Sequence, residues 1–204
     1  MSQQPQCTPT RKLLIQLSGP PGSGKSTLAT HLSRALPAII VNHDTLKTFF
    51  LSTSHDWTNA TQLTYELQWV LARDFLTQNH SVIMDSTCNY PRVRDTGIAL
   101  AAEHDALYVY VECRVSLDDL ELLDERIKQR DGMRSQRRGV WEPPVDAERD
   151  SIGEEEGKEL FRRWIEEPCR PEDERRTVVV ETGGALTPEE CCAYVMSEIG
   201  KWSG

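Results

Sequence analysis

The stretch Gly19-Pro20-Pro21-Gly22-Ser23-Gly24-Lys25-Ser26 decides the fold class of this chain of 204 residues. It satisfies the pattern G-x-x-x-x-G-K-[ST] in full, and Thr27 follows it. With glycine near 7% of residues, fewer than about one in a hundred chains of this length would contain the pattern by chance. An apolar run, residues 13–18, precedes the stretch, and helical periodicity follows over about 25–36. A strand, a glycine-rich turn and a helix in this order indicate an α/β fold.

The chemistry of this turn accounts for its residue types. Glycine reaches positive φ and has no Cβ to obstruct an anion, so successive N–H groups form a nest for a phosphate at the positive end of the following helix. We expect Lys25 to contact the β- and γ-phosphate oxygens and the Ser26 hydroxyl to ligate Mg²⁺. The residues predicted to bind a nucleoside triphosphate are Gly19, Pro20, Pro21, Gly22, Ser23, Gly24, Lys25, Ser26 and Thr27.

Short apolar runs alternate with longer helical patterns along the chain. The predicted strands are residues 13–18, 38–41, 81–85, 107–111 and 177–180. This alternation implies crossover connections, and near-continuous apolar strands are typical of a sheet that is covered on both faces. The sequence therefore predicts a three-layer P-loop NTPase fold of the α/β class, with a mainly parallel sheet of about five strands and a lid insertion.

Capping signals place the helices between these strands. A short helix is expected to start at an Asp44 N-cap, and Pro91 is expected in the first turn of another helix. Ser116 with Asp119, and Thr187 with Glu190, have the spacing of capping boxes. A longer helix before the third strand is predicted to bury a stripe made of Leu63, Leu67, Val70, Leu71 and Phe75.

Composition indicates an ordinary soluble globular protein, with 38% apolar and 27% charged residues. We expect a single domain over 1–204, with a disordered tail over 1–10, no membrane segment and a cytoplasmic location. The six cysteines form no C-x-x-C pair and are interpreted as free thiols. The net charge of −9 gives no global attraction for nucleic acid, so a polynucleotide substrate would need a local basic patch.

The stretch of about 131–157 does not fit the alternating pattern. It is rich in Arg, Gly, Pro and Glu, and it is longer than a usual connection. Two interpretations remain open for it, a functional lid or a poorly ordered insertion.

Two aspartates are candidates for the chemistry. Asp85 ends the third predicted strand beside the glycine-rich turn, where a carboxylate can hold a water of Mg²⁺; the alternative is a turn cap. Asp44 follows the second strand at the same carboxyl edge of the sheet, where open α/β sheets bind ligands. It is a candidate general base, and the alternative is a plain N-cap. Lys47, three residues on, is expected to face the same way.

Other P-loop classes fit less well. A GTPase needs an N-K-x-D element to read the base, and the chain contains none. A large oligomeric ATPase motor would need a second helical domain, for which 204 residues leave no room.

The motifs together resemble the P-loop kinase family that includes phage-type polynucleotide kinase and zeta-toxin-like small phosphotransferases, with an AAA-type ATP-binding domain. The resemblance spans about 13–138 and rests on the glycine-rich turn and on Asn42-His43-Asp44-Thr45-Leu46-Lys47. It implies that ATP and Mg²⁺ are used, that Asp44 is the base and that Lys47 helps to position the acceptor. Lys47 stands where polynucleotide kinases have Arg, and the two side chains bind phosphate differently.

The stretch after the third strand also resembles this family. Asp85-Ser86-Thr87 is followed by Asn89, Arg92 and Arg94, of which Asn89 and Arg92 are candidate substrate contacts. The alternative is a solvated helix start.

Arginines gather near the predicted lid. Arg126, Arg130 and Arg134 recur every four residues and would share one face of a continuous helix. In related kinases an Arg from this region contacts the transferring phosphates, so Arg126 or Arg130 is the candidate for that role. The alternative is surface pairing with neighbouring carboxylates. Trp57 and Trp141 are candidate walls of a substrate pocket, whereas Trp69 is expected in the core.

The sequence therefore predicts an ATP- and Mg²⁺-dependent kinase that transfers the γ-phosphoryl group to a hydroxyl of a small molecule or of a nucleic-acid 5′ end. Lys25, Asp44, Arg126 and Arg130 are the predicted catalytic residues. The alternative function is a nucleotide-dependent switch that hydrolyses ATP, and a domain that only binds ATP is a weaker third reading.

Overall fold

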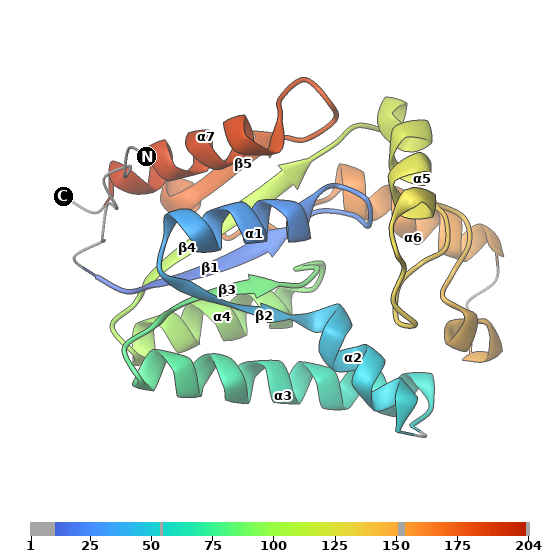
Figure 1. The fold of residues 1–204 in the computed structure, drawn as a ribbon, viewed down its shortest axis with the longest axis horizontal. Helices are drawn as coiled ribbons and strands as arrows, with labels where there is room; N and C mark the ends of the chain where they lie inside the picture. Colours follow the sequence, from blue (N-terminus) through green and yellow to red (C-terminus); the bar gives the residue numbers. More distant parts are fainter. Residues whose placement is uncertain (1–10, 54, 151–153, 203–204) are drawn as a thin grey trace.

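A computed structural model describes residues 11–53, 55–150 and 154–202. The expected tail over 1–10 lies outside the described residues. Figure 1 shows one sheet between helices, with a further group of helices beyond the heads of the strands.

The sheet has five parallel strands in the order β2-β3-β1-β4-β5. Their bounds are β1 Leu13–Ser18, β2 Ala38–Asn42, β3 Ser81–Asp85, β4 Leu107–Arg114 and β5 Thr177–Glu181. β1 and β3 are buried along their whole length, as expected for central strands that helices cover on both faces. The predicted strands and the α/β class are confirmed.

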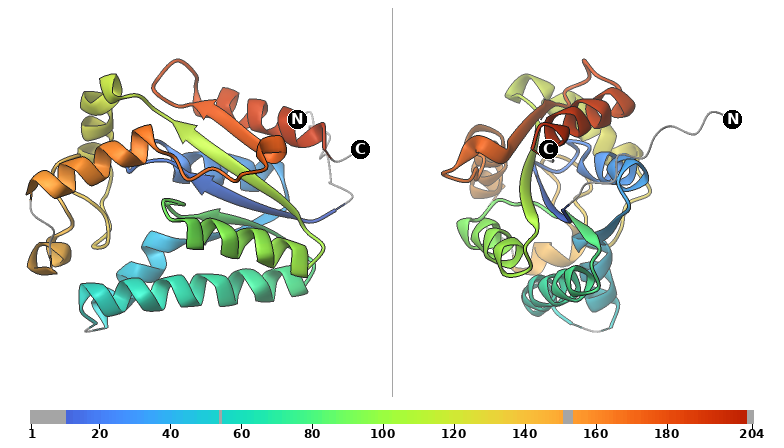
Figure 2. Two further views of the ribbon diagram at one scale, coloured as in Figure 1. Left: turned by 180° about the vertical axis from the view of Figure 1, so that it is seen from behind. Right: turned by 90° about the vertical axis from the view of Figure 1, so that its left-hand side faces the viewer.

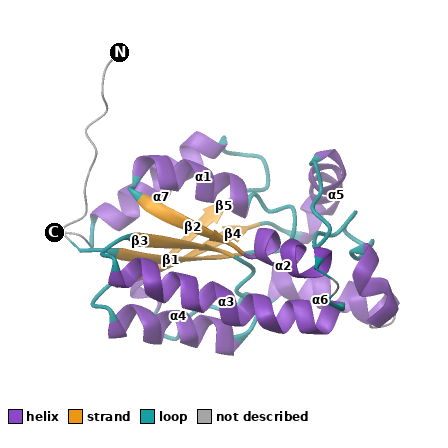
Figure 3. Cartoon of the chain, turned by 60° about the horizontal axis from the view of Figure 1, so that its bottom comes forward, coloured by secondary structure: helices purple, strands orange, loops and turns teal. Residues whose placement is uncertain are grey.

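Two layers of helices enclose the sheet (Figures 2 and 3). α1 (Lys25–Ala35) and α7 (Pro188–Gly200) pack on one face, in a core that includes Leu28, Leu32 and Val195. α3 (Trp57–Thr77) and α4 (Pro91–Glu103) pack on the other face with the alternate side chains of the strands. Because successive strand residues face opposite layers, both layers are anchored by the same short strands.

Three helices stand beyond the carboxyl edge of the sheet, toward which the strands point in Figure 1. They are α2 (His43–Ser52), α5 (Leu120–Gln129) and α6 (Glu154–Glu166); the short 3₁₀ turns are η1 (Leu117–Asp119), η2 (Val145–Asp150) and η3 (Glu174–Arg176). A small separate core joins α5, the loop 130–144 and α6. The candidate lid therefore has its own apolar interior. No helix in the described ranges combines the length and the apolar character that a bilayer crossing requires.

Most of the predicted caps are present. Pro91 is in the first turn of α4, Ser116 and Asp119 form a capping box at η1, and Thr187 and Glu190 form one at α7. The expected cap of α2 is wrong, because Asn42 is the N-cap and its Oδ1 accepts a bond of 2.8 Å from Thr45 N–H. This correction removes the cap as an explanation of Asp44.

The predicted stripe of α3 is also wrong. Its buried face consists of Ala60, Thr64, Gln68, Ala72 and Leu76, and Val70 is 61% exposed. Leu71 and Phe75 only flank the core. Small and polar residues can form this face because the helix lies close to its neighbours, and polar groups such as Thr64 Oγ1 bond within the helix. Trp57 begins α3 and is not in an irregular segment.

The packing of α4 gives a stability prediction for Gly97→Ala. A Cβ at Gly97 would collide with Gln16 Oε1 and lie 3.2 Å from the Tyr108 ring. Gln16 cannot move away, because its amide is bonded to Val93 O at 3.1 Å and to the Tyr108 hydroxyl at 2.7 Å. We expect the variant to lose about 1–3 kcal/mol of unfolding free energy in urea titrations.

The matched control is Gly157→Ala in α6, where an added Cβ meets open space. It should gain up to about 1 kcal/mol from helix propensity alone. A Gly97→Ala protein as stable as the wild type would contradict the packing argument.

Candidate active site

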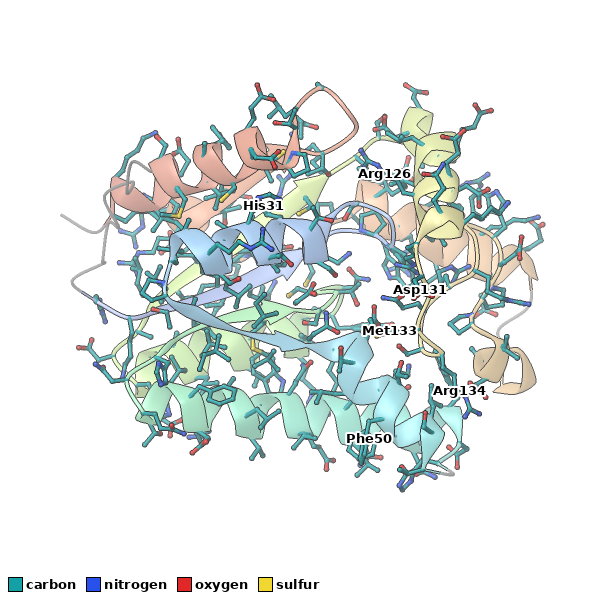
Figure 4. All side chains as sticks on the ribbon, viewed as in Figure 1. His31, Phe50, Arg126, Asp131, Met133 and Arg134 are labelled. Carbon is teal, nitrogen blue, oxygen red and sulfur yellow. The ribbon has the colours of Figure 1, made fainter. Side chains whose placement is uncertain are left out.

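A cavity of about 1100 Å³ lies at the carboxyl edge of the sheet. The glycine-rich turn, the first turns of α2 and α3, the loop after β3, the lid and the loop before α7 all contribute to its walls. Figure 4 shows Asp131 and Met133 between α5 and α2 at this edge, and Arg126 beside α5 near the loop before α7. A single opening of this size has room for a nucleotide and for a second ligand beside it.

The glycine-rich turn has the geometry of an anion cradle. Gly22 and Gly24 both have φ of 85°, a region that only glycine adopts without strain. Gly24 is the N-cap of α1 and gives no side-chain bond to the first-turn N–H groups. By contrast, Asn42, Asp56 and Thr187 cap α2, α3 and α7 with side-chain oxygens. The N-terminus of α1 therefore keeps free donors for an external anion.

Lys25 is buried at the base of this cradle. Its ammonium donates to Gly19 O and Pro20 O, both at 2.8 Å. Burial lowers the pKa of Lys25, and the nearby Asp85 and Asp44 partly oppose this effect. Among the described residues no carboxylate is within ion-pair distance of this ammonium, so a phosphate would replace neutral carbonyls with a stronger partner.

Ser26 and Asp85 form a pair that suits Mg²⁺. The buried Asp85 carboxylate accepts hydrogen bonds from the Ser26 hydroxyl and from Asn42 Nδ2, the latter at 2.5 Å. Burial raises the pKa of Asp85, and these two bonds and Lys25 lower it. A hard cation prefers such a hydroxyl and carboxylate set. The residues present therefore fit the ion that the sequence predicts.

Asp44 lies in the first turn of α2 and faces the cavity. Its Oδ2 accepts a bond of 2.7 Å from Gln136 Nε2 in the lid, and Oδ1 has no hydrogen-bond partner within the described part of the chain. One carboxylate oxygen is therefore held and the other is available to a ligand, which is the arrangement that a general base requires.

Lys47 is one turn further along α2 and is 6% exposed. Its ammonium lies 3.3 Å from the centroid of the Trp57 ring, a cation–π contact. Burial lowers its pKa to about 8, against an opposing effect of Asp44. The described residues offer this cation no carboxylate within 4 Å. Trp57 and Lys47 together form a wall of the cavity that is distant from the glycine-rich turn in sequence.

The lid arginines differ in their surroundings. Arg130 points into the cavity, and its Nε is buried without a hydrogen-bond partner in the described residues, whereas its NH2 group donates to Arg137 O at 3.0 Å. Arg126 donates to Thr182 O at 2.8 Å, on the side of the loop before α7. Arg134 forms a bidentate pair with Asp146 at 2.6 and 2.7 Å. Since α5 ends at Gln129, these three arginines do not share one helix face.

Arg137 is a cavity residue that the sequence did not single out. Its guanidinium donates to Val140 O at 2.9 Å and lies over the Phe161 ring, and burial lowers its pKa. Asn42 and Gln136 were missed as well, although each contacts a candidate aspartate. The position of Asn42 at the end of β2 was a usable signal, whereas Gln136 has none in the linear sequence.

The remaining wall is aromatic and polar. Tyr65, Tyr90, Asn89 and Trp141 line the cavity. His43 packs against Tyr65 with tilted rings whose centroids are 4.8 Å apart, and burial lowers the pKa of His43. Trp69 packs in the core as predicted.

One predicted contact, Arg92, lies elsewhere, and so does the neighbouring Arg94. Arg92 is exposed and is not part of the cavity wall. Arg94 donates to Arg170 O at 2.9 Å and pairs with Asp95. Among Asn89, Arg92 and Arg94, Asn89 is the one that lines the cavity.

Comparison with known proteins supports this description of the fold. A family model for the AAA domain matches residues 14–153. The APS kinase CysC of Mycobacterium tuberculosis, solved with AMPPNP and APS, aligns with a TM-score of 0.60 at 17% identity, covering 94% of this chain and 99% of that one. A gluconokinase from Sinorhizobium meliloti 1021 aligns with a TM-score of 0.59 at 18% identity, covering 94% and 93%. No curated protein sequence matches the chain.

A protein from Chloroflexus aurantiacus J-10-fl aligns with a TM-score of 0.66 at 18% identity, covering 94% of this chain and 98% of that one. At these identities the solved structures establish the fold. They do not establish the polynucleotide kinase or zeta-toxin subtype, which stays a prediction.

The buried ammonium of Lys47 predicts that Lys47→Met stabilises the ligand-free protein. A Lys whose pKa is lower in the folded than in the unfolded state costs stability at every pH below the folded value, and the cost disappears as the pH rises toward 10.5. After subtraction of the cation–π contact, we expect a gain of about 1–2 kcal/mol at pH 7. This gain should shrink between pH 8 and pH 10.5 in denaturant titrations.

The control for this measurement is Lys201→Met, because the Lys201 side chain is 60% exposed. This substitution should change the free energy of unfolding little at pH 7 and at pH 10.5. A Lys47→Met protein that is less stable than the wild type at pH 7 would show that the cation is well solvated.

Proposed function

The chain belongs to the AAA domain family, and on that basis and the geometry of its cavity we propose that it is an ATP- and Mg²⁺-dependent kinase. The observation that carries the proposal is that one cavity joins the phosphate cradle to Asp44 and to a separate wall with Lys47 and Trp57. A protein that only binds or hydrolyses ATP has no need of such a second compartment. The fold is shared with proteins named as kinases, which supports the proposal by analogy.

In this proposal the cradle and Lys25 bind the β- and γ-phosphates, and Ser26 and Asp85 hold Mg²⁺. When bound, Mg²⁺ neutralises charge on the phosphate oxygens. Asp44 accepts the proton of the acceptor hydroxyl while the oxygen of that hydroxyl bonds to the γ-phosphorus. The bond from phosphorus to the β,γ-bridging oxygen breaks, and ADP leaves.

Arg130 is the lid residue best suited to the transferring phosphoryl group. It lines the cavity, and burial lowers its pKa, so an anion beside its guanidinium would stabilise the charge. Arg137 adds a second buried guanidinium in the same loop. Arg126 serves the side of the cavity near Thr182, where we propose that it contacts the nucleotide.

The acceptor is proposed to be a small molecule that carries a hydroxyl. Lys47, Trp57, Tyr65 and Asn89 line one side of a cavity of about 1100 Å³, which has room for a compact ligand beside a nucleotide. The kinases with similar folds are named for APS and gluconate, both small molecules. A nucleic-acid 5′ end, as in polynucleotide kinases, is the second acceptor to test.

Asp44→Asn tests the base. We expect the rate of label transfer from γ-labelled ATP to fall about 10²–10⁴-fold, since a general base contributes that much, while ATP affinity by calorimetry changes less than about threefold. The acceptors are a fractionated metabolite extract and a 5′-hydroxyl oligonucleotide. Asp105→Asn, at the opposite edge of the sheet, removes the same charge as a control.

Label that appears only as free phosphate, at equal rates in the wild type and in Asp44→Asn, would exclude Asp44 from catalysis and favour the nucleotide switch. Label on one acceptor class and not on the other would identify the substrate type.

Arg130→Ala tests the lid against Arg134→Ala in the same loop. Arg130 lines the cavity and its charge has no carboxylate partner within 4 Å among the described residues, so its loss should lower kcat about 10²–10³-fold, the scale of one preorganised donor to a developing charge. Arg134 is half-exposed and paired with Asp146, so its loss should change kcat less than about threefold. Equal effects in steady-state assays would contradict the assignment of Arg130.

A further inference from the structure

The lid touches the candidate base through a short turn, Met133–Gln136. Gln136 N–H donates to Met133 O at 2.9 Å, and Met133 N–H donates to Gln136 Oε1 at 3.1 Å. The backbone and side chain of Gln136 therefore close the turn from both directions. This turn lies against the N-terminal end of α2.

Three hydrogen bonds at Ser135 fix the turn on α2. The Ser135 hydroxyl donates to Asp44 O at 2.9 Å and accepts from the Thr48 hydroxyl at 3.0 Å. Ser135 N–H donates back to Thr48 Oγ1 at 3.3 Å. Every donor has an acceptor, and Ser135 is 6% exposed, so the turn and α2 form a matched polar contact.

The side-chain amide of Gln136 has only one favourable orientation. Its Oε1 accepts from Met133 N–H, and its Nε2 donates to Asp44 Oδ2 at 2.7 Å. A flipped amide would place an oxygen against the carboxylate and an NH₂ group against an N–H donor. Gln136 thus links the lid turn directly to one oxygen of the base.

We propose that Gln136 is a positioning residue that orients the Asp44 carboxylate and couples lid docking to phosphoryl transfer. The inference rests on the proposed role of Asp44. With Oδ2 held by the lid, Oδ1 is the oxygen that faces the acceptor hydroxyl and takes its proton. When the lid turn is undocked, the carboxylate rotates about χ2, and the base is misplaced while the site is open to water.

The expected loss of rate follows from the orientation of the Asp44 carboxylate and not from its charge. A hydrogen bond to an ionised carboxylate stabilises that form and so slightly disfavours proton uptake. Misplacement of a reacting group by about 1 Å costs on the order of 10²-fold in rate, which exceeds this opposing effect. Net loss of rate is therefore expected when the bond is removed.

The test substitution is Gln136→Glu, which keeps an oxygen for Met133 N–H and removes the donor to Asp44. We expect kcat for label transfer to fall about 10–100-fold, with KM for ATP and for the acceptor within about threefold. Gln129→Glu places the same charge elsewhere in the same cavity, and Gln136→Met removes the donor to Asp44 without adding charge. Ser135→Ala weakens docking and leaves the Asp44 carboxylate contact in place.

The outcomes separate the possibilities. A loss of kcat in Gln136→Glu and Gln136→Met that exceeds that of Gln129→Glu supports positioning. A loss no greater than that of Gln129→Glu, or wild-type kcat in Gln136→Met, overturns it in favour of a charge effect. Ser135→Ala should also lower kcat, and wild-type kcat in that variant overturns the coupling of docking to transfer. Acceptor-free ATP hydrolysis is measured in parallel, because water meets the same base: an unchanged rate in Gln136→Glu with a reduced rate in Asp44→Asn also overturns the inference.

Failure of the proposed function would give a different result. In that case Asp44→Asn itself leaves both transfer and hydrolysis unchanged, and the role of Gln136 is rejected together with that of its partner.

Discussion

The buried ammonium of Lys25 is the constraint on which the site depends. A cation in this position requires partners, and the chain supplies two backbone carbonyls of the glycine-rich turn in place of a carboxylate. Gly19, Gly22 and Gly24 of this turn all have positive φ, so glycine lets the backbone curve around the ammonium without strain. This glycine-rich turn must join a strand to a helix at a fixed separation. The burial of the Lys25 ammonium therefore depends both on the local backbone of the turn and on the parallel sheet that holds the turn.

The cavity and the whole chain carry opposite charge balances. The chain has a net charge of −9, yet the cationic side chains that line the cavity outnumber its carboxylates: Lys25, Lys47, Arg126, Arg130 and Arg137 against Asp44, Asp85 and Asp131. Burial lowers the pKa of the Lys and Arg groups that are most enclosed, a sign that each would gain from an anion. The positive field is therefore local, and it focuses anionic ligands into one opening.

The sequence predicts correctly those features that depend on residues close together along the chain. The glycine-rich turn, the five strands and the caps at Ser116 and Thr187 follow from neighbouring residues, and the structure contains them. The stripe of α3 failed because burial there depends on how closely the helix approaches the sheet, so small residues and Gln68 replaced larger apolar ones. The cap at Asp44 failed because Asn42, two residues earlier, makes the same bond and also binds Asp85.

The lid shows why the rest of the site could not be predicted. Its interior is apolar, with Leu123, Ile127, Val140 and Phe161 packed together, and this core closely approaches Gly22 of the glycine-rich turn. Its far end meets α2 through hydrogen bonds of Ser135 and Gln136 and through a contact of Met133 Sδ with Thr45 Oγ1 at 3.8 Å. Each such bond contributes about 0.5–1.5 kcal/mol net, far less than an apolar core of this kind. The segment is therefore held together mainly by its apolar core, and weaker polar bonds join it to α2. That division depends on a contact between residues 92 positions apart, which no local pattern encodes.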